Sequence, residues 1–330
     1  MSIRFGWCLL LLGLCFSGCE DSKGKGPGGP LSVGVTGKFK IVTTCGMVTD
    51  IVREVTGPRA DVTGLIHTGV DPHLYRSTPE DNRLVQEADI VFYTGLKLEG
   101  PLEDGFRVGA TAGKRIFAVT DDIPKEKLHF QAGFGDHPDP HVWNSVSLWS
   151  LCVERVAQQM MLVDPPHAVE YRVRADRYRE ELKELDQFVH ACIQSIPEDR
   201  RYMVTAHDAF EYFSAAYGIP VHAVQGITTE TEPGVKDIRD LVDFVVEHKV
   251  SAVFVEEGVN EGFVRSVIEG AAARGWQVEI GGKLFSDSMG KEGTHDGTYI
   301  GMLEHNAIML AQRLGGKVPE RPKMATKVDH

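Results

Sequence analysis

Residues 164–196 read DPPHAVEYRVRADRYREELKELDQFVHACIQSI and form a long helical pattern in the middle of the chain. Asp164 is the predicted N-cap and Pro165 the first helical residue, and no glycine or proline interrupts the pattern after its first turn. Apolar residues spaced by three and four make one continuous stripe: Tyr171, Ala175, Tyr178, Leu182, Leu185, Val189, Cys192 and Ile196. About thirty residues at roughly 1.5 Å each give a rod of roughly 45 Å, long enough to run along two domains and join them.

The segments on either side of this helix alternate short apolar runs with amphipathic helical patterns. Before it, the predicted strands are KFKIVTT (38–44), ADVTGLI (60–66), ADIVFYTG (88–95) and KRIFAVT (114–120). After it, they are RYMVTA (201–206), PVHAVQG (220–226), SAVFVEE (251–257) and WQVEIGG (276–282). Such alternation predicts parallel sheets covered by helices.

The predicted fold is therefore α/β with two lobes, each a mainly parallel sheet flanked by helices, joined by one long backbone helix. We expect an N-terminal lobe at 38–163, the linking helix at 164–196 and a C-terminal lobe at 197–330. A coiled-coil arm is the alternative for the helix, but a single stripe between two α/β halves favours the link.

Composition excludes one class of partner. The 330 residues carry a formal net charge of -12. Because phosphate binding needs a basic face, this charge argues against nucleic acid.

The first residues have the layout of a secretory signal. One positive charge precedes the apolar run FGWCLLLLGLCF, and SGC follows it. We expect a signal peptide at 1–18, a lipidated Cys19, and a flexible tether at 19–37 that anchors the protein to a membrane. A plain cleaved signal is the alternative. The mature chain then keeps Cys45, Cys152 and Cys192 without a Cys-x-x-Cys pair, which indicates neither a redox motif nor a thiolate zinc site.

The chain contains the same stiff loop twice, as GVDPHLY from residue 69 and as DPHVW from residue 139. In each loop a proline restricts the preceding aspartate, so His73 and His141 lie on rigid turns. Each loop follows a predicted strand and precedes a predicted helix, and ligands bind in such connections of open α/β sheets. A single histidine is more often structural, but two in the same setting favour a shared ligand role.

The C-terminal half supplies two further groups. His207 follows the strand RYMVTA directly, with Asp208 as the predicted N-cap of the next helix, and Asp287 lies just beyond the last predicted strand. Three imidazoles and one carboxylate complete the coordination of a divalent transition ion.

Residues from about 38 to 314 resemble the metal-binding lipoproteins known as cluster A-I, the solute-binding components of ABC importers for zinc, manganese or iron. The matching stretches are GVDPHLYRSTPEDNRLVQEADIVFYTGLKLE, DPHVWNSV, VTAHDAFEYFSAAYGIPV and LFSDSMGKEGTHDGTYIGMLEHN. By position, the resemblance implies His73, His141, His207 and Asp287 as metal ligands. It also implies two lobes joined by one long helix, an ABC permease and its ATPase as partners, and a location in the cell envelope outside the cytoplasmic membrane, either in the periplasm or on the outer surface.

The resemblance also bears on the metal. Histidine rather than glutamate at the place of His207 favours Zn²⁺, and Asp287 is shared with relatives that transport Mn²⁺ or Fe²⁺, so these remain alternatives. Zinc-importing relatives often have a His-rich loop before the second ligand, whereas this chain has only His129 and His137 there. His137 is either a weak capture site or an exposed loop histidine.

Several acidic residues are open to two interpretations. Asp71 and Asp139 either orient the histidine rings or only shape Asp-Pro turns. Glu256 matches an acidic position of the family near the site and is either a partner of a ligand or a surface carboxylate. His305 is predicted to have a structural role.

A zinc hydrolase and a surface adhesin are the two alternatives to a metal-delivery protein. A zinc hydrolase needs an open coordination position, but here four side chains fill the shell and no His-Glu-x-x-His motif occurs. A surface adhesin is the other alternative, and no sequence feature favours it. We expect no enzyme activity, no catalytic cofactor and a monomer.

Overall fold

The computed structural model describes residues 37–131 and 134–320. The predicted signal peptide, Cys19 and nearly all of the predicted tether lie outside these residues.

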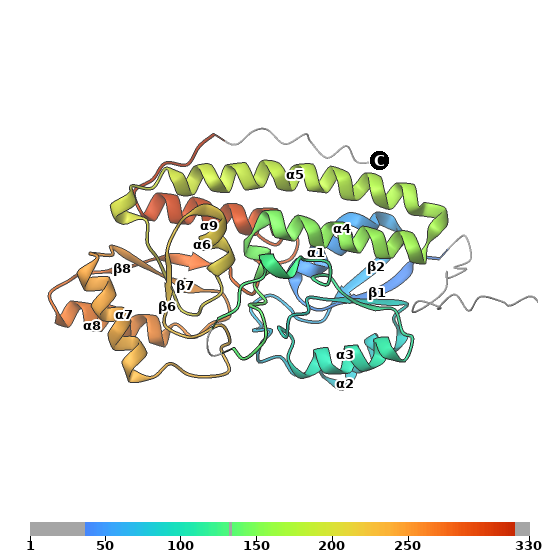
Figure 1. Ribbon diagram of the computed structural model, residues 1–330, viewed down its shortest axis with the longest axis horizontal. Coiled ribbons are helices and arrows are strands. Elements are labelled where there is room, and N and C mark those ends of the chain that lie inside the picture. The colour runs from blue at the N-terminus through green and yellow to red at the C-terminus, as the bar shows by residue number, and fades with distance from the viewer. Residues whose placement is uncertain (1–36, 132–133, 321–330) are drawn as a thin grey trace, which may run out of the picture.

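The N-terminal lobe is a four-stranded parallel sheet with the order β2-β1-β3-β4. Its strands are β1 (Phe39–Thr43), β2 (Ala60–Gly64), β3 (Ile90–Tyr93) and β4 (Ile116–Ala118). Its helices are α1 (Gly46–Thr56), α2 (Pro79–Glu87), α3 (Pro101–Thr111) and α4 (Val146–Val163). Successive side chains of a strand point to opposite faces of the sheet, and each face has its own apolar core. Ile41 and Phe92 pack with α1 and α4 on one face. Val42 and Val91 pack with α2 and α3 on the other. The sheet is therefore covered on both faces, as predicted (Figure 1).

The C-terminal lobe contains two parallel strand pairs, β5–β6 and β7–β8. The strands are β5 (Met203–Thr205), β6 (Val221–Ala223), β7 (Ala252–Glu256) and β8 (Glu279–Leu284), and β5 lies beside β7. The helices are α6 (Glu211–Tyr217), α7 (Val235–Glu247), α8 (Gly262–Ala273) and α9 (Tyr299–Arg313). Every predicted strand of both lobes is present.

The long helix α5 (Ala168–Gln194) runs along both lobes and joins them (Figure 1). All eight residues of the predicted stripe are buried, in one apolar core shared with α1, α4 and α9. A helix that buries its stripe within the globule is not a projecting arm, so the coiled-coil alternative is wrong. None of the described helices is both long and apolar enough to cross a membrane.

The start of the linking helix differs from the prediction. Pro165–His167 form a 3₁₀ turn, and the α-helix begins at Ala168. Asp164 is the N-cap residue of this turn, as predicted, but its side chain makes no capping bond. Its carboxylate instead accepts hydrogen bonds from Tyr171 Oη at 2.7 Å and from Arg59 at 3.2 Å. These donors engage the carboxylate, which explains why its side chain makes no capping bond.

Candidate metal centre

His73 lies in the loop between β2 and α2. The carboxylate of Asp71 accepts a hydrogen bond from the backbone N–H of His73 at 2.8 Å, which closes an Asx turn around Pro72. The following helix is fixed by a capping box in which Thr78 and Asp81 bond to each other's backbone N–H. The loop therefore enters α2 at a defined point.

His141 lies between β4 and α4 in a loop with the same local turn. Asp139 Oδ1 accepts from the backbone N–H of His141 at 2.9 Å and lies 2.7 Å from the ring atom Nδ1. Ser145 caps α4, and its side chain accepts from the backbone N–H of Leu148. When Nδ1–H donates to this carboxylate, Nε2 is the ring atom that faces the site and can bind an ion.

His207 follows β5 and is held by Glu256 at the end of β7. Glu256 Oε1 accepts from the backbone N–H groups of Ala206 at 2.8 Å and His207 at 2.9 Å, and Oε2 lies 2.6 Å from His207 Nδ1. Glu256 is thus a buried partner of His207 and not a surface carboxylate. The predicted cap at Asp208 is wrong, because α6 begins only at Glu211 with Phe210 as its N-cap.

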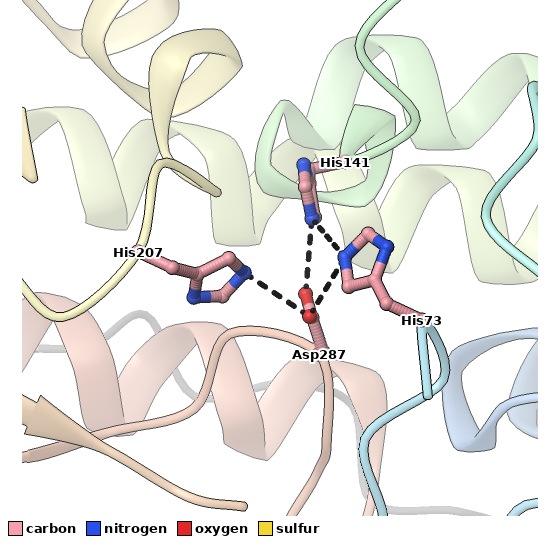
Figure 2. Close-up of side chains that lie close together, drawn as sticks. All are labelled: His73, His141, His207 and Asp287. Atoms are coloured by element: carbon pink, nitrogen blue, oxygen red, sulfur yellow. Dashed lines mark hydrogen bonds and ion pairs between the residues drawn. The ribbon is translucent and has the colours of Figure 1, made fainter. Parts of the chain in front are cut away.

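Asp287 lies three residues beyond β8, and the two lobes bring it together with the three histidines (Figure 2). All four side chains are buried, and their potential ligand atoms lie within 4.8 Å of one another. Nε2 of His73 is 3.2 Å from Nε2 of His141 and 3.3 Å from Asp287 Oδ2. Asp287 Oδ1 is 3.3 Å from His141 Nε2, and Oδ2 is 3.1 Å from His207 Nε2.

Four of these separations, 3.1–3.3 Å, are close to those around a small tetrahedral ion, and the whole set of ligand atoms fits within 4.8 Å. Metal–ligand bonds of about 2.0–2.1 Å, typical of zinc, place neighbouring ligand atoms of a tetrahedron about 3.3–3.4 Å apart. Both oxygens of Asp287 point into the cluster, so the carboxylate could also supply a fifth bond (Figure 2).

The electrostatics of the cluster favour added positive charge. Burial would lower the pKa of His141, but the charges of Asp287 and Asp139 outweigh it and raise that pKa to about 9. Burial also opposes the charged form of His207, yet Glu256 and Asp287 raise its pKa well above the ordinary value. Burial favours a neutral Asp287, but His207 and His141 hold its pKa well below the usual range. The cluster therefore stabilises a proton or a metal ion.

The remaining predicted residues have different roles. Asp71 contacts the backbone of His73 but not its ring, and its second oxygen accepts from Thr229 Oγ1 at 2.5 Å. His137 is exposed, and its ring lies near Phe134 rather than near the cluster. His305 contacts the carbonyl of Lys283 at 3.0 Å, in agreement with a structural role.

The sequence gives no sign of several contacts that hold the site. Tyr212 Oη donates to the carbonyl of Asp139 at 2.9 Å, and Trp143 Nε1 donates to the carbonyl of Ser286 at 2.8 Å. The partners in these bonds lie 73 and 143 residues apart. The DPHVW motif contains Trp143, but nothing in the sequence indicates that Ser286 is its partner.

A family model described as zinc-uptake complex component A, periplasmic (ZnuA), matches residues 41–313. The chain belongs to the ZnuA family. Members of this family are substrate-binding proteins of metal importers and not enzymes, so the hydrolase alternative does not hold. Membership also places the chain outside the cytoplasm, in the cell envelope.

Relatives of this ZnuA-family chain carry names for different metals. The manganese-binding lipoprotein MntA of Bacillus subtilis (strain 168) is 40% identical over 308 residues, which cover 93% of this chain and 97% of MntA. The zinc-binding protein TroA of Treponema pallidum (strain Nichols) is 39% identical over 281 residues, 84% of this chain and 89% of TroA. The solved structure of the periplasmic zinc-binding protein TroA matches with a TM-score of 0.81 at 38% identity, over 84% of this chain and 99% of that one. The names of these relatives therefore do not determine which metal this chain binds.

Proposed function

We propose that this protein captures one divalent transition-metal ion between its lobes and delivers it to an ABC importer. The ligands in this proposal are His73, His141, His207 and Asp287. One observation supports it above all others: three imidazoles and one carboxylate from four separate loops converge in a buried cluster. Without a cation or shared protons, the two facing Nε2 atoms of His73 and His141 would repel each other at 3.2 Å.

Zinc is the favoured ion. Nitrogen-rich coordination suits zinc better than manganese, and the divalent stability order places zinc above manganese at such a site. The separations of 3.1–3.3 Å between neighbouring ligand atoms are compatible with zinc bonds of about 2.0–2.1 Å.

Manganese or ferrous iron is the second candidate. Both oxygens of Asp287 face the cluster, so a two-oxygen contact would raise the coordination number, as a harder and larger ion prefers. The name of MntA is in line with this alternative.

The remaining parts of the proposal concern anchoring and partners. We infer that the signal peptide at 1–18 is removed, that lipid on Cys19 holds the protein at the membrane, and that residues 19–37 act as the tether. In this proposal a monomer with lobes at 38–163 and 197–330 presents its ion to the permease, and the ATPase drives transport.

The test is elemental analysis of protein purified without added metal, followed by titration of the metal-free form. We expect one tightly bound ion per chain. His73→Ala and His207→Ala should each weaken binding greatly, although the two residues lie in different lobes. Wild-type affinity in either variant would refute a shared site between the lobes.

A further inference from the structure

The two Asp-Pro-His loops are attached to the C-terminal lobe in different ways. The loop of His141 is held by buried hydrogen bonds. Trp143 Nε1 donates to the carbonyl of Ser286, and Asn144 Nδ2 donates to the carbonyl of Ala209, each at 2.8 Å. Tyr299 Oη also donates to the carbonyl of Trp143 at 2.7 Å. Large side chains shield these bonds from water, so this loop is firmly fixed.

The loop of His73 is attached by small polar groups that water partly reaches. Thr229 Oγ1 donates to Asp71 Oδ2 at 2.5 Å, and the backbone N–H of Gly69 donates to Ser288 Oγ at 2.8 Å. Thr68 Oγ1 donates to the carbonyl of Gly290 at 3.1 Å. All three bonds are only partly buried. We call the bonds made by Thr229 and Ser288 the clasp.

Glycine is required where the clasp closes. Gly69 has a φ of +78°, and Gly258 of the other lobe has a φ of +85°. A Cβ at Gly258 would lie 3.2 Å from the carbonyl oxygen of Gly69. The backbones of the two lobes thus meet directly beside the clasp, and a side chain at Gly258 would strain this contact.

The ring of His73 is also less supported than the other two. Asp139 holds Nδ1 of His141 at 2.7 Å, and Glu256 lies 2.6 Å from Nδ1 of His207. Asp71 instead reaches across to Thr229, so no carboxylate of the described residues holds Nδ1 of His73. An imidazole without such a partner is held less rigidly against the metal.

A cavity of about 470 Å³ opens on the same side of the site. Its walls include Thr68 and Val70 of the His73 loop, Asp287 and Ser288 of the second lobe, and Arg53 of α1. Solvent therefore has room beside the clasp and beside one of the four proposed ligands.

From this asymmetry we infer that Thr229 and Ser288 are positioning residues, which hold His73 on the ion and set the rate at which the ion leaves. The ion departs on the His73 side after the clasp opens, while the His141 loop stays in place. This inference rests on the proposed function, because it describes release from the same site.

The test combines metal release with hydrogen exchange in the purified full chain. Zinc-loaded protein is mixed with an excess of chromogenic chelator, and the dissociation rate is followed by absorbance. Thr229→Val and Ser288→Ala should each raise this rate about five- to tenfold, the effect of one lost hydrogen bond, with little change in the association rate. Thr229→Ser retains the hydroxyl and should release zinc at the wild-type rate.

The matched control is Thr228→Val. Thr228 accepts a hydrogen bond from the backbone N–H of Glu230 in the same loop but makes no bond to the His73 loop among the described residues. It should leave the dissociation rate unchanged. A wild-type rate in Thr229→Val, or an equal acceleration in Thr228→Val, would overturn the inference.

Hydrogen exchange in the metal-free protein separates this inference from the proposed function. Thr229→Val should accelerate exchange at residues 66–75 and leave residues 139–145 unchanged, whether or not zinc binds. Equal acceleration at both loops would contradict the clasp. Failure of the wild-type protein to bind any ion would instead refute the proposed function and the release role with it.

Discussion

Glu256 Oε2 lies 2.6 Å from Nδ1 of His207, and both side chains are completely buried. The same carboxylate accepts two backbone N–H groups, so its position is fixed before any ion arrives. A carboxylate at Nδ1 sets the tautomer of an imidazole and raises its basicity toward a metal. Glu256 should therefore contribute to affinity without touching the ion.

Glu256→Gln tests this relationship. The amide retains an acceptor for the backbone N–H groups but removes the negative charge beside His207. We expect metal affinity to fall about 10- to 100-fold, measured by titration of the metal-free protein. The control is Glu261→Gln, whose carboxylate accepts from Arg265 at 2.9 Å in an exposed pair. Equal losses in both variants would argue against a specific role for Glu256.

The preference for zinc can be measured directly. Because three imidazoles outnumber the single carboxylate, zinc should bind more tightly than manganese in a competition titration. Manganese that displaces equimolar zinc would contradict this expectation. Growth of a deletion strain tests the transported ion separately, and rescue by manganese but not zinc would overturn the assignment to zinc uptake.

Anchoring depends on Cys19, which lies outside the described residues. Two acyl chains bury enough methylene groups to hold a protein stably at a membrane. Cys19→Ala should therefore release the protein into the soluble fraction with its metal affinity intact. Fractionation followed by metal titration checks both points, and unchanged membrane retention would count against lipidation.

Glu103 predicts a pH dependence of stability that is independent of the metal site. Burial, reinforced by the charge of Glu99, raises the pKa of Glu103 from 4.5 to about 7. Between these values the folded state binds this proton more strongly than the unfolded state does. The contribution of Glu103 to the free energy of unfolding therefore falls as pH rises from 4.5 to 7.

Glu103→Gln removes this titration, and its amide oxygen can still accept from the backbone N–H of Lys97. In metal-free protein the variant should be more stable than wild type by about 3 kcal/mol near pH 8 and equally stable near pH 4. Denaturant unfolding at the two pH values measures the difference. Glu126→Gln is the control because that side chain is exposed, and a difference of similar size there would refute the explanation.

The sequence by itself determined the order of strands and helices, the buried stripe of α5, and the loops that contain His73, His141, His207 and Asp287. Each of these follows from a local pattern: periodic apolar residues, a proline after aspartate, or a polar residue directly after a strand. The capping box at Thr78 is equally local, because all its partners lie within three residues.

Only the tertiary structure decided which side chains meet. Asp71 and Asp139 occupy the same motif and close the same local turn, yet Asp139 holds the ring of His141 whereas Asp71 bonds to Thr229, 158 residues away. Glu256 likewise meets a histidine 49 residues distant. The turn is encoded by neighbouring residues, and the ring contact of Asp139 lies within the same loop. Glu256 meets His207 because β5 lies beside β7, and Asp71 meets Thr229 because the two lobes pack together. Neither kind of packing leaves a periodic trace in the sequence.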